Sequence, residues 1–413
     1  MNPLHKSVII IGGGPAGLAA ALALHKLGIH DMLLLERENT LGGILRQCIH
    51  DGFGLTRFGT SLSGPEYADR FITQVEGLCI PCVTGATVIN LTAQKQVTVA
   101  TPDGLMTYTA DAIILAMGCR ERTRGALAIP GQRVAGVYTA GVAQSYINLK
   151  NIMVGKQAVI LGSGDIGLIM ARRLTLEGAQ VLGVYELLPH PSGLSRNVEQ
   201  CLNDYNIPLY LSHTVTNIHG HERLSAVTVS QVDSENRPIE GTERTIPCDT
   251  LILSVGLIPE NELSLAAGVA LSPATKGASV DEHYQTSVPG IFAAGNVLHV
   301  HDLVDFVSLE GEKLANAVYS YLQGALHECP VQVSPGEGLS YVLPQQLSGK
   351  QDVTLSFRVR TPHPACTIAL WQDGQCIATK ALRRALPAEM QTIDLPAGSL
   401  LSKNKVEVVL QHG

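Results

Sequence analysis

Two glycine-rich motifs of the same form, Gly-x-Gly-x-x-Gly, constrain the fold of this chain more than any other feature. The first occupies residues 12–17 and the second residues 162–167. Each follows a short apolar segment, residues 8–11 and 159–161, and each precedes an Ala- and Leu-rich stretch typical of a helix. An acidic residue, Glu36 or Glu186, follows each motif after the same interval. This order of strand, glycine turn, helix and acid is the fingerprint of a βαβ unit that binds a dinucleotide.

Each part of the fingerprint has a physical role. The first glycine permits a tight turn, the second lets the backbone approach a pyrophosphate, and the third lets helix and strand pack closely. The helix N-terminus presents free N–H groups to the phosphates. The acid accepts hydrogen bonds from a ribose hydroxyl. Two such units predict two bound dinucleotides, and we expect a hydride to pass between them.

Composition agrees with a Gly/Ala-rich α/β protein of two or three domains. Of 413 residues, 45% are hydrophobic, only 4% are aromatic and 41 are glycine. A net charge of −7 without a long basic run argues against nucleic acid or an anionic membrane as the main partner. No apolar run reaches the ~20 residues of a membrane span. Nine scattered cysteines and an early first strand, which leaves no room for a signal peptide, predict a reduced, cytoplasmic protein.

The pattern of elements predicts an α/β fold with two nested, Rossmann-like dinucleotide-binding domains in three layers (ββα and αβα). The first domain is expected to comprise residues 1–124 and 284–328, with helices at 15–27 and 303–322. The second domain, residues 125–283, is inserted into it and includes a small antiparallel hairpin near residues 226–232. The chain thus leaves the first domain and later returns to it.

Residues 339–413 follow a segment of linker composition and show a different period. Val353, Leu355, Phe357 and Val359 alternate with polar residues, which is typical of a half-buried strand. Asp373-Gly374 between two such runs predicts a type I′ hairpin. We expect a small C-terminal, antiparallel, all-β domain without chemistry of its own, which docks a partner or a second copy of the chain.

The order of the motifs resembles that of the pyridine nucleotide–disulfide oxidoreductase superfamily, over roughly residues 5–325. Besides the two fingerprints, the resemblance rests on Gly42-Gly43, on the strand ending at Met117-Gly118 and on a late Gly295-Asn296 turn. It implies that the first unit binds FAD and the second NAD(P). The predicted flavin-binding residues are Gly12, Gly14, Pro15, Ala16, Gly17, Glu36, Arg37, Gly43, Val88, Ala116, Gly118, Gly295, Asn296, Leu303 and Val304. The predicted nicotinamide-nucleotide-binding residues are Gly162, Gly164, Asp165, Ile166, Gly167, Glu186 and Gly256.

The late turn departs from the usual pattern of the superfamily, in which an aspartate accepts hydrogen bonds from the ribityl hydroxyls. Asn296 stands there and can both accept and donate, but carries no charge. The following helix, beginning near Leu303 and Val304, is expected to direct its N-terminus at the flavin pyrimidine ring and to stabilise negative charge there. A carboxylate at Glu186 favours NADH over NADPH, because it repels a 2′-phosphate.

A disulfide reductase needs a pair of redox-active cysteines, and the chain is poor in candidates. Cys79 and Cys82 form a Cys-x-x-Cys, but we expect them in one strand, where they would point to opposite faces. Cys48, shortly after Gly43, is the candidate single catalytic thiol. No metal site is expected from His299, His301 and Asp302. These residues are predicted to line the flavin pocket, or in the case of Asp302 to cap the next helix.

Longer segments resemble the FAD/NAD subunits of bacterial multisubunit flavin dehydrogenases. They are residues 41–54, 64–67, 193–196 and 295–302, and Asn296 belongs to this pattern. In those assemblies the subunit works beside a second flavoprotein similar to glycerol-3-phosphate dehydrogenase or to an amino-acid or opine oxidase. The leading hypothesis is therefore an FAD-dependent, NAD(H)-linked electron-transfer subunit in an oligomer or hetero-complex. The alternatives are a stand-alone thiol, disulfide or peroxide reductase using Cys48, and a non-catalytic FAD-binding scaffold.

Overall fold

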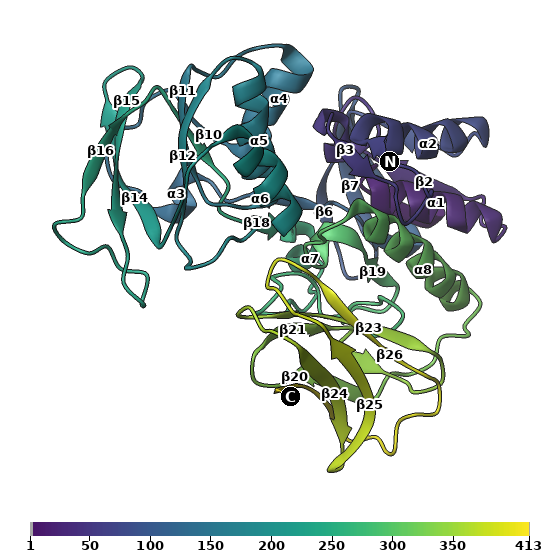
Figure 1. Cartoon of the computed structure of the whole chain (residues 1–413). Coiled ribbons are helices and arrows are strands. Elements are labelled where there is room, and N and C mark those ends of the chain that lie inside the picture. The colour runs from purple at the N-terminus through teal and green to yellow at the C-terminus, as the bar shows by residue number, and fades with distance from the viewer. Residues whose placement is uncertain (1–2, 413) are drawn as a thin grey trace. The chain divides into compact units, whose positions relative to one another are not determined.

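The computed structural model describes residues 3–412. The chain forms two compact units, with boundaries between Cys119 and Arg120 and between Ile258 and Pro259 (Figure 1). The second unit is inserted into the first, as the nested arrangement predicted. The short strands β9 (Cys119–Glu121) and β18 (Leu257–Pro259) contain the two points at which the chain passes from one unit to the other.

A mixed sheet forms the centre of the first unit. Strands β5-β2-β1-β8 are mutually parallel, β19 pairs with β8 in the same direction, and β8-β7-β6 continue the sheet as an antiparallel meander. The strands are β1 (Leu4–Ile11), β2 (Met32–Leu35), β5 (Cys82–Val83), β6 (Thr87–Leu91), β7 (Gln96–Thr101), β8 (Gly104–Leu115) and β19 (Ile291–Ala293).

Alternate residues of these buried strands face two different layers. Val8 and Ile10 pack against helices, whereas Ile9 and Ile11 pack against the β6–β7 side, as the two-residue period of a strand requires. Helices α1 and α8 lie side by side on the first face (Figure 1). The remaining elements of this part are α1 (Pro15–Lys26), η1 (Gly43–Gln47), β3 (Asp51–Phe53), β4 (Leu62–Ser63), α2 (Gly64–Gly77), α7 (Glu262–Ala266), η3 (Gly295–Val297) and α8 (Val304–Leu322).

The second unit contains a five-stranded parallel sheet in the order β10-β17-β11-β12-β13. An antiparallel sheet, β14-β15-β16, adds one strand to the hairpin that the sequence predicted. The strands of the second unit are β10 (Val137–Thr139), β11 (Gln157–Leu161), β12 (Gln180–Glu186), β13 (Leu209–Leu211), β14 (His213–Gly220), β15 (Leu224–Gln231), β16 (Arg244–Pro247) and β17 (Thr250–Leu253). Its helices are α3 (Arg124–Leu127), α4 (Ala140–Lys150), α5 (Asp165–Leu176), α6 (Ser195–Cys201) and η2 (Asn203–Tyr205).

The C-terminal residues of the first unit form two sheets around one apolar core, β22-β20-β27-β24-β25 and β21-β23-β26. Asp373 and Gly374 both have positive φ, which confirms the type I′ hairpin between β24 and β25. One pair, β20 and β27, is parallel, so the domain is all-β but not purely antiparallel. The strands are β20 (Val331–Pro335), β21 (Leu339–Leu343), β22 (Gln346–Leu347), β23 (Val353–Val359), β24 (Cys366–Gln372), β25 (Gln375–Leu382), β26 (Gln391–Leu395) and β27 (Val406–His412).

Residues 259–283, which the sequence assigned to the second domain, lie in the first unit. The reason is their apolar side chains. Val269 and Val280 are buried in the same cluster as Ile9 and Ile113 of the first sheet. Among residues 3–412, no helix is both long and apolar enough to cross a lipid bilayer.

Candidate functional site

The first glycine turn joins β1 to α1. Gly12 has a φ of +112°, and a side chain there would collide with the carbonyl group of Ala116, so only glycine fits. A side chain at Gly17 would collide with the Gly12 carbonyl, so this contact needs glycine to bring α1 close to the turn. Around Gly14, by contrast, the nearest atom to an added Cβ is 4.0 Å away, at Gly43. The backbone at Gly14 is therefore open to a ligand.

Glu36, which follows β2, is hydrogen-bonded to this turn. One carboxylate oxygen accepts the backbone N–H of Gly13 at 2.7 Å, and the other accepts the N–H of Glu38 at 2.8 Å. Glu36 is only 6% exposed. A buried carboxylate that two backbone groups orient, and that keeps acceptor capacity on both oxygens, fits the hydroxyls of a ribose.

The second glycine turn, between β11 and α5, has the same pattern of hydrogen bonds. Glu186, the last residue of β12, accepts the N–H of Ser163 at 2.9 Å on one oxygen and the N–H of Leu188 at 3.0 Å on the other. Ser163 is the second residue of its motif, and Leu188 follows Glu186 by two positions, as the corresponding residues do in the first unit. The two units thus contain the same carboxylate-and-turn arrangement, one in each.

Hydroxyl groups reinforce the second arrangement. The side chains of Ser163 and Ser192 both donate to the oxygen of Glu186 that also accepts the Ser163 N–H, at 2.5 and 2.8 Å. The N–H of Gly167 donates to the hydroxyl of Ser254 at 3.0 Å. One oxygen of Glu186 therefore has three donors and the other has one. Acceptor capacity for a ribose hydroxyl remains on the less occupied oxygen.

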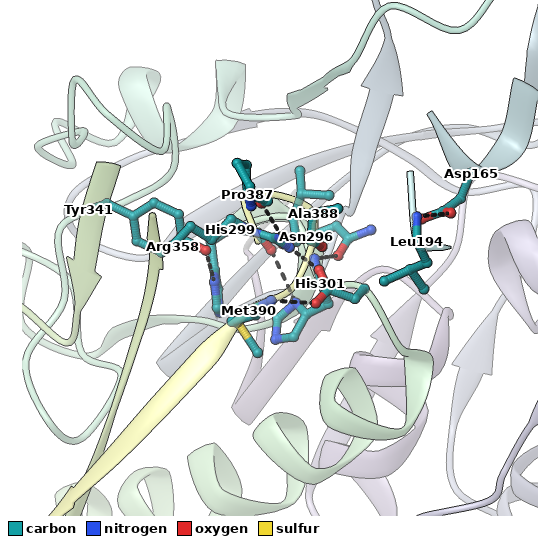
Figure 2. A network of polar contacts seen from close by, with 12 residues as sticks. Asp165, Leu194, Asn296, His299, His301, Tyr341, Arg358, Pro387, Ala388 and Met390 are labelled. Carbon is teal, nitrogen blue, oxygen red and sulfur yellow. Dashed lines mark hydrogen bonds and ion pairs between the residues drawn. The ribbon is translucent and has the colours of Figure 1, made fainter. Parts of the chain in front are cut away.

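Helices α1 and α5 begin at these turns with the N-cap residues Gly14 and Gly164, which have no side chain to occupy the first-turn N–H groups. Such helix ends are anion sites and fit the pyrophosphate of a dinucleotide. Asp165 has a separate structural role. Its carboxylate accepts the N–H of Leu194 at 2.8 Å (Figure 2). It also accepts the side-chain amide N–H of Asn197 at 2.6 Å, and the two bonds tie the start of α6 to α5.

Most of the other predicted flavin-binding residues lie near the carboxyl ends of the parallel strands. Ala116 and Gly118 follow β8, and Gly43 begins η1 next to Gly14. Arg37 is exposed directly after Glu36. Val88 lies apart from them by sheet order, because β6 is an edge strand separated from β1 by β8 and β7. In the second unit, Ile166 lies in the first turn of α5 and Gly256 follows β17.

The late turn, η3, follows β19 directly. The Gly295 N–H donates to the carboxylate of Glu310 at 2.5 Å, and an added Cβ at Gly295 would lie 3.1 Å from the methyl group of Ala16 in α1. The side-chain oxygen of Asn296 accepts the N–H of His301 at 3.0 Å. Asn296 thereby orders the loop that leads to Leu303 and Val304, the N-cap and first residue of α8.

A buried polar network, which sequence analysis did not assemble, lies behind this turn. His299 Nε2 lies 3.1 Å from a Glu310 oxygen, and its Nδ1 lies 3.2 Å from the Tyr341 hydroxyl. His301 Nε2 lies 3.6 Å from the same Glu310 oxygen, and its Nδ1 contacts the His299 carbonyl at 3.1 Å. Only His299 and His301 could be singled out from the sequence. Glu310 and Tyr341 come from α8 and from the C-terminal β domain.

The network shifts two ionisation equilibria. Burial lowers the pKa of His299, and the neighbouring His301 adds to this, so the neutral ring is favoured. Burial by itself would raise the pKa of Glu310, but the charges and hydrogen bonds of His301 and His299 outweigh it and hold that pKa far below its usual range. Glu310 is therefore held as a buried, ionised carboxylate.

Asp302 does not cap α8, so this prediction is wrong. The N-cap is Leu303, and Asp302 instead forms an ion pair with Arg358 of β23 and accepts the N–H of Met390 at 2.6 Å. Arg358 also donates to the carbonyl groups of Val300 and of the segment 387–388 (Figure 2). Residues of the β domain thus bind the segment between the late turn and α8 through an ion pair and hydrogen bonds. The sequence carried no local signal for these contacts.

The cysteines offer no ready redox pair. None of the nine, all of which are described, is in a disulfide. Cys79 is an exposed turn residue with a φ of +52°, whereas Cys82 begins β5, so the prediction of one strand through both was wrong. Burial raises the pKa of Cys48 to about 12 and, with a smaller contribution from Glu76, the pKa of Cys82 to about 11. These shifts are opposite to those that a reactive thiolate needs.

Comparison with known proteins agrees with this geometry. The family described as pyridine nucleotide-disulphide oxidoreductase matches residues 6–324. The chain is 25% identical over 361 residues to the glutamate synthase [NADPH] small chain of Mycobacterium tuberculosis, covering 80% of this chain and 69% of that protein. It is 26% identical over 317 residues to an opine oxidase subunit of Agrobacterium tumefaciens, covering 70% and 60%.

Among solved structures, the thioredoxin reductase of T. acidophilum superposes with a TM-score of 0.64 at 25% identity, covering 76% of this chain and 98% of that one. The family match spans most of the chain and includes both glycine turns and both carboxylates. The chain therefore belongs to the pyridine nucleotide-disulphide oxidoreductase family, and it is an FAD-dependent enzyme that exchanges electrons with NAD(P)H.

Proposed function

We propose that this protein is the NADH-linked electron-transfer subunit of a cytoplasmic, multisubunit flavin dehydrogenase and that it exchanges electrons with a second flavoprotein. The state of the cysteines carries the proposal. Cys48 is the candidate catalytic thiol, and its pKa of about 12 leaves it protonated at neutral pH. With no thiol pair to accept electrons, the flavin must exchange them with another centre.

The chain's own residues act by holding and orienting the two coenzymes. Glu36 and the start of α1 would hold the ribose and pyrophosphate of FAD, and Glu186 and the start of α5 would hold those of NADH. When bound, the flavin accepts or gives up a hydride, and this chemistry needs no side chain as a general base. The main contribution of the protein is positioning, which is worth up to about 7–11 kcal/mol in well-oriented systems.

The choice of NADH over NADPH rests on Glu186. This carboxylate is 4% exposed and is held by Ser163 and Ser192. A 2′-phosphate would have to lie against a buried negative charge that cannot turn away, because four donors fix it. A 2′-hydroxyl would instead donate to it. We therefore expect discrimination by repulsion of the phosphate as well as by attraction of the hydroxyl.

The partner is proposed from the relatives. By their names, the glutamate synthase small chain and this opine oxidase subunit belong to larger enzymes. Purification of the tagged chain from its native host, at low salt and without crosslinker, tests the idea. We expect a second flavin-containing polypeptide to co-purify in a fixed ratio, and the complex to reduce its flavins with NADH. A monomeric, isolated chain with full turnover on a small-molecule acceptor would contradict it.

The alternative is a stand-alone reductase that uses Cys48 as its thiol. Its support is the position of Cys48, immediately after η1 and 3.4 Å from the carbonyl oxygen of Ile44. Cys48→Ser separates the two functions. A thiol-dependent reductase would lose turnover, whereas an electron-transfer subunit would keep NADH-driven reduction of its flavin.

A further inference from the structure

We propose that Glu282, His283 and Cys329 form a binding site for one zinc-type divalent cation, separate from both dinucleotide sites. One ligand atom from each residue lies within 4.8 Å of the others. The side chains of Glu282 and His283 are 0% and 6% exposed, and Cys329 is partly buried. Carboxylate, imidazole and thiolate are the three ligand types that Zn²⁺ takes from proteins.

An unsatisfied atom points to the cation. His283 Nε2 is buried and has no hydrogen-bond partner in the described chain, and the nearest carboxylate oxygen, of Glu282, is 3.9 Å away. The other ring nitrogen, Nδ1, lies 3.4 Å from the Gln351 amide. Either a buried N–H lacks an acceptor or a lone pair faces a carboxylate, and both arrangements are unfavourable. A cation between Nε2 and Glu282 removes both difficulties.

The arrangement around the ring suits a metal ligand. The two ends of a side-chain amide are interchangeable in assignment, so Gln351 can present its oxygen to Nδ1 of His283. Nδ1 then carries the proton and donates it, and Nε2 offers its lone pair toward the cluster. Metal-bound histidines usually have such a partner on their second nitrogen, because it fixes the tautomer and the ring orientation.

Among the described residues, no Lys or Arg side chain forms an ion pair with Glu282. The Glu282 carboxylate accepts the N–H of Ser348 at 2.8 Å and also the Ser348 hydroxyl, and its only ion-pair partner in the described chain is His283. Asp281 lies beside it and binds two backbone N–H groups. A divalent cation would offset this buried negative charge and bind the thiol as a thiolate.

The His299–His301–Glu310 cluster provides an internal comparison. It gathers two imidazoles and a carboxylate within the same 4.8 Å, but its nitrogens all contact a carboxylate, a hydroxyl or a carbonyl. Its donors satisfy one another without a metal, so we assign no ion there. The distinction between the two clusters is the unsatisfied Nε2 of His283.

A metal here would join three segments of the chain. Glu282 and His283 belong to the return segment before β19, Cys329 lies in the linker between α8 and β20, and Ser348 and Gln351 lie in the β domain. Zn²⁺ bonds of about 2.0–2.3 Å would draw the ligand atoms together, and a water would complete the usual four ligands. The site would thus fasten the β domain and its linker to the flavin-binding part.

Metal binding to the full-length, FAD-containing protein tests the proposal. After removal of metals with a chelator, the protein is titrated with Zn²⁺ or Co²⁺, and bound metal is counted by mass spectrometry. We expect one tightly bound ion per chain and a thiolate-to-cobalt absorption in the Co²⁺ difference spectrum. His283→Gln and Cys329→Ser should each weaken binding at least about tenfold. His5→Gln and Cys376→Ser, which remove exposed side chains elsewhere, should leave it unchanged.

A measurement on the wild-type protein does not depend on whether the variants fold. Alkylation of Cys329, followed by peptide mass spectrometry, should slow at least about tenfold when Zn²⁺ is added, while alkylation of exposed Cys376 keeps its rate. The proposal is overturned if the wild-type protein binds no ion after metal removal. It is also overturned if the His283→Gln/Cys329→Ser double variant binds the ion as tightly, or if Zn²⁺ does not protect Cys329. None of these results depends on NADH oxidation.

Discussion

Glu186 accepts hydrogen bonds from both the backbone N–H and the hydroxyl of Ser163, at 2.9 and 2.5 Å. The acid proposed to bind the ribose is therefore held by the turn proposed to meet the pyrophosphate. Glu36 is bound to Gly13 of the first turn in the corresponding way, at 2.7 Å. Each site is oriented before a nucleotide arrives, so little ordering of side chains remains to oppose binding.

Replacing Glu186 with Gln should weaken NADH binding and relax discrimination against NADPH. Loss of a charge-assisted hydrogen bond to the ribose costs about 1.5–3 kcal/mol, which is about tenfold or more in affinity. Values of kcat/KM for both nucleotides measure the change. Glu177→Gln at the end of α5 is the matched control and should change neither value. An unaltered NADH/NADPH ratio in the Glu186 variant would refute the assigned role.

Replacing Glu36 with Gln should reduce FAD retention. The same loss of a charged acceptor predicts FAD binding weaker by about tenfold or more, read as a lower flavin-to-protein absorbance ratio after gel filtration. Glu38→Gln is the control, because Glu38 contributes only its backbone N–H to Glu36 and its side chain is exposed. Equal flavin content in both variants would show that Glu36 does not hold the ribose.

The dinucleotide turns were predictable because their signals are local. Strand, glycines, helix and acid follow one another along the chain, and the predicted helix at 15–27 corresponds to α1, Pro15–Lys26. The hairpin at Asp373-Gly374 was predictable for the same reason, since positive φ at two successive residues needs specific residue types.

The parts that escaped prediction depend on contacts between distant residues. Arg358 reaches Asp302 across 56 positions, and Tyr341 reaches His299 across 42, so no local pattern marks either pair. Asp302 carries a good capping side chain, but the stronger interaction with a guanidinium takes it away from α8. Residues 259–283 were predicted in the second domain but lie in the first unit, because their side chains complete a core formed by distant strands.

Arg358→Gln should destabilise the fold strongly. The side chains of Arg358 and Asp302 are only 16% and 12% exposed, and loss of one partner leaves a largely buried charge, at a cost of about 3–5 kcal/mol. Urea unfolding followed by circular dichroism measures this. Arg384→Gln removes an exposed pair with Glu389, in which Arg384 is 58% exposed, and should cost at most about 1 kcal/mol. A similar loss of unfolding free energy in the two variants would contradict the assigned role of the buried Arg358–Asp302 ion pair.

Stability should fall as the pH is lowered through the ordinary pKa of histidine. Burial holds the pKa of His299 below 6.5, so below that pH the unfolded chain takes up a proton that the folded chain does not. One such group changes the free energy of unfolding by up to about 1.4 kcal/mol per pH unit. Glu310, whose pKa is lowered from 4.5, adds a further loss below that value. His299→Gln should flatten the slope near pH 6.

The Cys48 thiol should react slowly. With a pKa of about 12, its thiolate fraction at pH 8 is about one part in ten thousand, so iodoacetamide should modify exposed Cys376 far sooner. Peptide mass spectrometry over time records both rates. Cys48→Ser should keep NADH-driven flavin reduction. Rapid alkylation of Cys48, or loss of reduction in the serine variant, would instead favour the thiol reductase.

The central claim is that this chain passes a hydride between nicotinamide and flavin without a thiol. An anaerobic titration of the FAD-loaded protein with NADH, followed by the absorbance of oxidised flavin, tests it most directly. We expect stoichiometric bleaching that is equally complete in wild type and in Cys48→Ser. A folded, FAD-loaded protein whose flavin absorbance is unchanged by both NADH and NADPH would contradict the account.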